Sequence, residues 1–95
     1  MRVEWSTTAR EERKALFHRI AADNRLAAVN LNLLIADRLE ALVRFPAMYP
    51  AGKVPGTRHL VLNREHVLVY AWHPREEVIH ILRIVGTRQQ RQRLT

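Results

Sequence analysis

Three arginines in the second half of the chain are the side chains best suited to hold an anionic group. Strand-like patterns place Arg58 and Arg83 near two corners of a sheet, and Arg88 follows the last such pattern. Arginine pairs bidentately with carboxylates and phosphates. No acidic residue follows Glu77 in the chain, so Arg88 lies in an unopposed basic stretch. We take Arg58, Arg83 and Arg88 as candidate anion-binding residues.

A second set of side chains could bind a metal ion or transfer protons. The expected strand register places His59, Tyr70 and His80 opposite one another across three strands. No Asp or Glu occurs in these strands to orient the imidazoles, so we interpret the three as polar groups at the rim of the core. The chain has no Cys and only three Gly, which excludes thiolate chemistry and a Gly-rich phosphate loop. We therefore expect no metal, no cofactor and no catalytic residue.

The elements that must position these residues follow from hydrophobic periodicity. Thr8 and Glu11 have the spacing of a capping box, so a helix should begin at about Ala9 and break at Asp23-Asn24. A second helix should follow before Pro46, and the two form a helical hairpin. The predicted segments are a strand at 2–5, helices at about 9–22 and 26–44, and strands at 59–62, 67–72 and 78–85.

This order, β-α-α-β-β-β, is typical of an α+β domain with the helical hairpin on one face of an antiparallel sheet. Residues 1–95 form one domain, of which about 89–95 is a basic polar tail. Pairing Leu62 with Val67 and Trp72 with Val78 sorts the strand side chains onto two faces, and both are largely apolar.

We expect the helices on the face that carries Tyr70 and Trp72. The opposite face would then be an open apolar surface rimmed by Arg58 and Arg83, which is typical of a partner-binding site. A terminal segment folded over this face, or a slip of one residue in register, would remove that surface. Its predicted residues are Leu60, Leu62, Val67, Val69 and Ile81.

Composition and charge limit the classes of partner that the chain could bind. The chain has 95 residues and a net charge of +7, with 47% hydrophobic and 26% charged residues, as in a small globular domain. Residues 51–95 carry eight basic and three acidic groups, which favours nucleic acid, a nucleic-acid-bound machine or an acidic protein as partner. A generic basic surface is the alternative. The longest apolar run, 67–72, cannot span a membrane, and no signal core precedes it. We expect a cytoplasmic protein without membrane contact.

Several segments together resemble ParE toxins of the RelE/ParE superfamily. The resemblance covers about residues 2–91, and neither the Pro-Gly-Thr-Arg strand entry nor the Leu-Arg-Ile-Val ending would be sufficient alone. One departure is Gly86, where many ParE chains have a His. The segments that carry the resemblance are 3–6, 54–61, 67–70, 79–85 and 87–90.

The resemblance implies the RelE/ParE toxin fold and the toxin of a type II toxin–antitoxin pair. It implies two partners: a cognate antitoxin, which would cover the apolar face, and DNA gyrase, which would be the target. We expect Arg58, Arg83 and Arg88 to be the target-binding residues, and direct contact with nucleic acid to be secondary. RelE-type relatives instead cut mRNA with a basic strand cluster and with an Arg and a Tyr near the C-terminus. The corresponding stretch of this chain offers Arg58 and Arg88, but the other strand positions are Leu60 and Val67, and Leu94 lies near the Tyr position. The implied function is therefore gyrase inhibition without enzymatic activity. There are two alternatives. The first is an mRNA endoribonuclease that uses Arg58, Arg83 and Arg88 together with His59 or His80, and the second is an inactive binding module.

Overall fold

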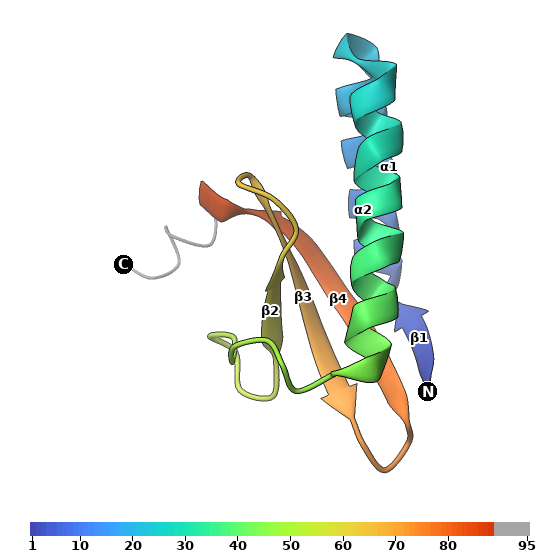
Figure 1. Ribbon diagram of the computed structural model, residues 1–95. Coiled ribbons are helices and arrows are strands. Elements are labelled where there is room, and N and C mark those ends of the chain that lie inside the picture. The colour runs from blue at the N-terminus through green and yellow to red at the C-terminus, as the bar shows by residue number, and fades with distance from the viewer. Residues whose placement is uncertain (89–95) are drawn as a thin grey trace.

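A computed structural model describes residues 1–88 of the chain, so the predicted basic tail at 89–95 lies outside the described residues (Figure 1). Two helices lie between the first and second strands, in the predicted order β-α-α-β-β-β. The elements are β1 (Arg2–Trp5), α1 (Thr7–Asp23), α2 (Arg25–Arg44), β2 (Arg58–Val61), β3 (His66–His73) and β4 (Val78–Gly86). Within residues 1–88, neither helix is long and apolar enough to cross a membrane.

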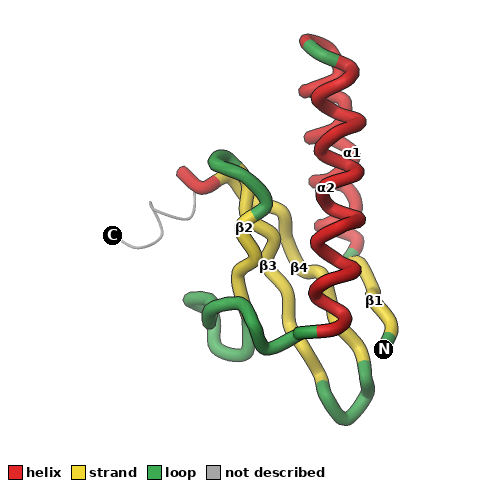
Figure 2. The backbone as a smooth tube through the Cα atoms, in the orientation of Figure 1, coloured by secondary structure: helices red, strands yellow, loops and turns green. Residues whose placement is uncertain are grey.

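The sheet has the strand order β1-β4-β3-β2. Strands β2, β3 and β4 form an antiparallel meander, whereas β1 pairs with β4 in parallel, so the four-stranded sheet is mixed. Figure 2 shows the helical hairpin upright beside the β1–β4 side of the sheet, with its tip extending past the strands. The predicted α+β class and the helical hairpin on one face of the sheet are confirmed.

Each helix begins at a side-chain cap. The Ser6 hydroxyl accepts a hydrogen bond from the Ala9 N–H at 3.0 Å, so α1 begins at Thr7 and Thr8 is not the cap that we predicted. The Asn24 side-chain Oδ1 accepts from the Ala27 N–H at 3.1 Å, and α2 begins at the next residue. Both contacts satisfy backbone donors that the first turn leaves unpaired, and the predicted break at Asp23-Asn24 is confirmed.

The predicted strand register is wrong by one residue at both hairpins. Val61, not Leu62, pairs with Val67, because the Asn63 side chain accepts from the N–H groups of Glu65 and His66 and tightens the turn. At the other hairpin Val78 pairs with His73, not with Trp72. A one-residue slip moves a strand's side chains to the opposite face of the sheet.

A β-bulge between Val69 and Tyr70 shifts the register again within the β3–β4 pair. The helix-covered face therefore carries residues from both of the faces that we predicted. Leu60, Leu62 and Ile81, predicted to be open, are at most 3% exposed and lie in the core with Tyr70. Val67 is also buried, at 5%, and only Val69 of the predicted open face is half-exposed. The expectation of an open apolar face formed by these five residues is wrong.

Candidate functional site

Arg58 serves the loop that joins α2 to β2. Its Nη1 donates to the carbonyl oxygen of Tyr49 at 2.7 Å and to that of Ala47 at 3.3 Å. Beside it the buried Tyr70 hydroxyl donates to the Pro46 carbonyl oxygen at 2.6 Å, and burial raises the pKa of Tyr70 to about 12. Arg58 therefore holds the loop onto the sheet, and its guanidinium is engaged by the chain's own backbone.

Arg83 is held by a helix. Its Nε lies 3.0 Å from both carboxylate oxygens of Glu12, and its Nη2 lies 2.7 Å from Oε2. The same carboxylate accepts the Ile84 N–H at 3.0 Å, at the edge of β4 that β1 leaves uncovered after Trp5. These hydrogen bonds and the Glu12 charge raise the pKa of Arg83 above its ordinary value. Two of the three predicted anion-binding arginines are thus engaged in intramolecular contacts.

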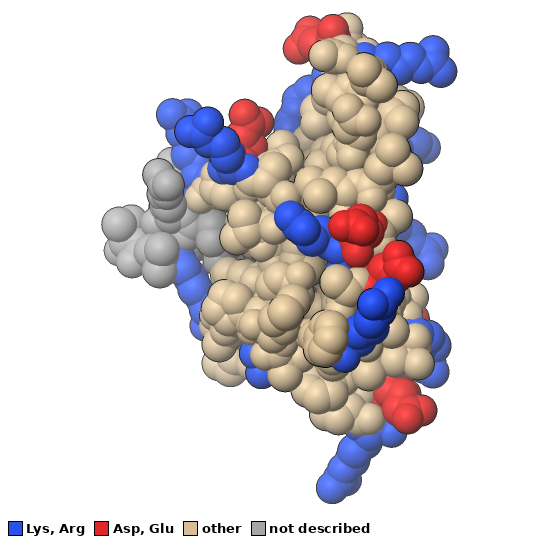
Figure 3. Space-filling model, in the orientation of Figure 1, with Lys and Arg blue, Asp and Glu red and all other residues tan. Residues whose placement is uncertain are grey.

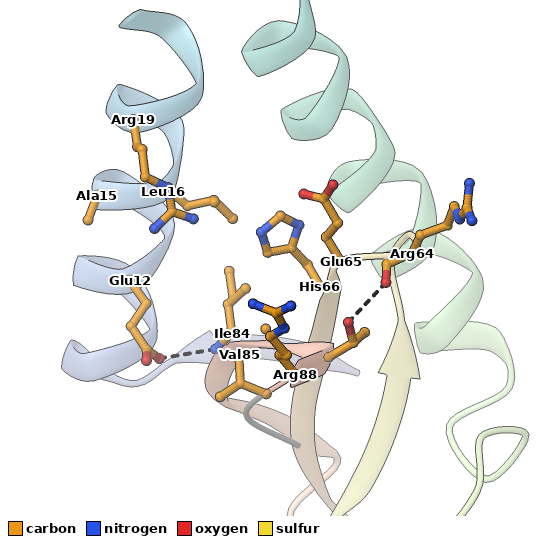
Figure 4. Close-up of a pocket in the computed structure, with 12 residues that line it drawn as sticks. Glu12, Ala15, Leu16, Arg19, Arg64, Glu65, His66, Ile84, Val85 and Arg88 are labelled. Carbon is orange, nitrogen blue, oxygen red and sulfur yellow. Dashed lines mark hydrogen bonds between the residues drawn. The ribbon is translucent and has the colours of Figure 1, made fainter. Parts of the chain in front are cut away.

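Arg88 lies at the mouth of a groove between α1 and the ends of β3 and β4 (Figure 4). The groove encloses about 980 Å³. In Figure 4 the side chains of Arg19 and Arg88 turn toward this space from opposite sides, whereas Arg64 points away from it. The residues that line the groove are Glu12, Ala15, Leu16, Arg19, Arg64, Glu65, His66, Ile84, Val85, Gly86, Thr87 and Arg88.

Three arginines and two glutamates line the groove. Within residues 1–88, Arg19, Arg64 and Arg88 form no ion pair, whereas Glu12 is already bonded to β4. Burial lowers the pKa of His66, and the charge of Arg19 lowers it further, against the opposite effect of Glu65. A neutral imidazole and cations around an apolar floor can hold an anionic group of a partner.

The structure separates the predicted polar trio. Tyr70 faces the helices and pairs with Arg58 and Ile81 in the sheet, whereas His59 pairs with Val69. Among residues 1–88 no group of three His, Asp or Glu side chains could hold a metal ion. His80 instead lies 3.9 Å from Glu4, and its ring meets the edge of His73.

Sequence reasoning missed Glu12, Arg19 and His66. The spacing of Glu12, Leu16 and Arg19 along the first helix does place them on one face, since residues three and four apart are neighbours. Nothing in that spacing shows that this face opens onto the end of the last strand. His66 lies opposite Gly86 in the sheet, a pairing that depends on the register.

Comparison with known proteins identifies the family. The model of a family described as the ParE toxin of type II toxin–antitoxin system, parDE, matches residues 3–91. The chain belongs to this ParE toxin family. The resemblance seen in the sequence is thereby confirmed, and the chain is the toxin component of a type II toxin–antitoxin system. A comparison with curated proteins gave no match.

Two solved structures share the ParE fold. A chain of the chromosomal ParDE system from P. aeruginosa is similar, with a TM-score of 0.74, 23% identity, and coverage of 90% of this chain and 95% of that chain. A YoeB/ParE toxin from Agrobacterium tumefaciens has a TM-score of 0.67 and 13% identity, covering 90% of this chain and 98% of that one. In this ParE toxin Arg88 lines a groove together with Arg19 and His66.

Proposed function

We propose that this ParE toxin poisons DNA gyrase in the cytoplasm, has no enzymatic activity of its own, and is neutralised by a cognate antitoxin. Membership of the ParE family supports gyrase as the target. The basic surface supports a partner that is anionic or bound to nucleic acid. Figure 3 shows that Lys and Arg side chains outnumber acidic ones on the displayed face.

The observation that carries this proposal is the engagement of the sheet arginines. Cleavage of RNA needs free cations and a proton-transfer group around one phosphate. Here Arg58 is bonded to loop carbonyls and Arg83 to Glu12. Leu60 and Val67, at positions where RelE-type relatives carry their basic cluster, are buried. The described sheet therefore offers no cluster of that kind.

Arg88 then becomes the main target-binding residue that we propose, with Arg19 beside it in the groove. Arg88 is exposed and forms no ion pair within residues 1–88. We assign Arg58 and Arg83 to holding the fold around the site. A contact with gyrase is thus proposed at the groove, not on the sheet face.

The antitoxin surface must also differ from the predicted one, because Leu60, Leu62, Val67 and Ile81 are buried. The outer side of α2 offers an alternative. Leu26, Val29 and Leu33 are 68%, 41% and 62% exposed, at the i, i+3, i+7 spacing of one helix face. We propose that the antitoxin covers this α2 stripe, since exposed apolar patches mark partner sites.

One observation favours the mRNA endoribonuclease alternative. His66 lines the same groove as Arg19 and Arg88, and His is the side chain that most often acts as a general acid or base. Its Nδ1 is 3.2 Å from Asn63 Oδ1. The nuclease, if present, would use this groove rather than His59 or His80.

Inducing the chain in cells separates these functions. Gyrase poisoning should leave double-strand breaks in the chromosome with mRNA 5′ ends unchanged. A nuclease would produce new codon-specific mRNA ends without breaks. Normal growth of induced cells with neither change would identify an inactive binding module.

A further inference from the structure

A second cavity lies on the other side of α1 from the Arg88 groove. It encloses about 410 Å³. The α1 residues that line this cavity have the i, i+3, i+4, i+7 spacing of one helix face. The α1 residues that line the Arg88 groove have the same spacing but begin two positions later. Two residues are about half a turn of an α-helix, so the two sets lie on opposite faces of α1. The cavity is lined by Trp5, Arg10, Arg13, Lys14, Phe17 and Asn32.

Arg13 is the unusual residue of this cavity. It is half-buried, its guanidinium carbon lies 4.8 Å from the centre of the Trp5 ring, and its Nε donates to Asn32 Oδ1 at 3.3 Å. Within residues 1–88 it meets no carboxylate. Burial lowers its pKa. A partly buried cation without a counter-ion is unfavourable, so the fixed guanidinium indicates a place for an external anion.

The remaining lining residues match such a ligand. Arg10 and Lys14 are exposed and form no ion pair within residues 1–88. No acidic residue lines the cavity. Trp5 and Phe17 supply aromatic surface between these cations. Cations interleaved with aromatic side chains are the arrangement by which proteins hold single-stranded nucleic acid.

We propose that this cavity binds a single-stranded segment of DNA, with phosphates on Arg10, Arg13 and Lys14 and one base against Phe17. Its volume suits one planar ring system and is too small for a helix of a protein partner. This proposal rests on the proposed function, because gyrase is the protein that would open the DNA contacted by this site.

Fluorescence of a single tryptophan tests the site directly. In a Trp72→Phe background Trp5 is the only tryptophan, and the change removes a buried indole N–H that has no hydrogen-bond partner within residues 1–88. We expect a short oligo-dT to quench Trp5 emission at low salt. The double variant Arg10→Gln/Lys14→Gln should weaken binding about tenfold and lower the slope of log affinity against log salt by about 1.4, since each phosphate contact contributes about 0.7.

The charge-matched control is Arg25→Gln/Arg75→Gln, which removes two exposed arginines that form no ion pair within residues 1–88. It should leave the affinity nearly unchanged. Equal losses in the two double variants would overturn the site, as would quenching by a poly-Glu peptide but not by oligo-dT, which would assign the cavity to an acidic protein. Gyrase-mediated DNA breaks that persist without any oligo-dT binding would retain the proposed function and reject this site.

Discussion

The Arg83 guanidinium and the Glu12 carboxylate join the last strand to the first helix through hydrogen bonds of 2.7 and 3.0 Å. Glu12 also accepts the Ile84 N–H at 3.0 Å, where β4 has lost its β1 neighbour. The Glu12 side chain therefore supplies a hydrogen-bond acceptor to the unpaired edge of β4, and it also holds the Arg83 guanidinium, which is then not free on the sheet surface. The groove that contains Arg88 begins directly beside this contact.

Replacing Glu12 by Ala should destabilise the toxin by about 1–2 kcal/mol. The Arg83 and Ile84 donors would lose a charged acceptor, and the partial exposure of the pair moderates the loss. Urea denaturation measures the change. Glu11→Ala, on the same helix but exposed, is the control and should leave the free energy of unfolding nearly unchanged. Equal stability of the two variants would contradict a structural role for Glu12.

Stability should fall in mildly acidic solution. Burial lowers the pKa of His66 below its ordinary 6.5. Below that pH the unfolded chain takes up a proton that folded His66 does not, so the free energy of unfolding decreases as pH falls, until the pH passes the folded pKa. His59, whose pKa burial also lowers, acts with the same sign.

Urea titrations between about pH 7.5 and 5.5 check this expectation. His66→Gln should reduce the dependence of stability on pH. An unchanged pH dependence in the His66 variant would show that this residue is not responsible.

The helices follow from local sequence signals. The apolar spacing of α2 and the turn at Asn24 are visible in the chain, because helix periodicity and side-chain caps act within a few residues. The strand faces could not be predicted in the same way. The side chains that face the core depend on the turn that Asn63 closes, which sets the register of β2 against β3, and on the bulge between Val69 and Tyr70. A shift of one residue at either place moves side chains from one face of the sheet to the other.

The site was predictable only in part. Arg88 was selected as a candidate because it lies close to the last strand, in the stretch 87–90 that resembles the ParE family. Arg58 and Arg83 have the same residue type, yet their partners are loop carbonyls and a glutamate 71 residues away in sequence. Such contacts depend on how β1 ends and how the loop packs, so residue type alone could not separate structural arginines from free ones.

Changing Arg88 to Ala should abolish toxicity in cells while leaving the fold and antitoxin binding nearly intact, because its side chain is exposed and unpaired within residues 1–88. Colony counts after induction without antitoxin measure toxicity. Thermal melting measures the stability of the fold, and a pull-down with the antitoxin measures antitoxin binding. Arg75→Ala, at an exposed position in the β3–β4 turn, is the matched control and should stay toxic. Full toxicity of a stable Arg88→Ala protein would remove this residue from the site.

The α2 stripe predicts where the antitoxin binds. Leu33→Ser should not destabilise the fold, since the side chain is 62% exposed. It should weaken antitoxin binding about tenfold or more, because burial of a Leu side chain is worth about 1.5–3 kcal/mol. Calorimetry with the antitoxin encoded beside the toxin gene measures the affinity. Met48→Ser, 58% exposed in the loop before β2, is the control; an equal loss there would argue against the α2 stripe.

The most direct test of gyrase as the target is DNA cleavage by purified gyrase in the presence of this toxin. Supercoiled plasmid is incubated with gyrase and toxin, then treated with detergent and protease, and the linear product is quantified. We expect linear plasmid to accumulate with the parent and with Arg75→Ala, but not with Arg88→Ala. Absence of linear plasmid with the parent toxin, together with codon-specific mRNA cuts in a translating extract, would contradict the gyrase assignment and identify a nuclease.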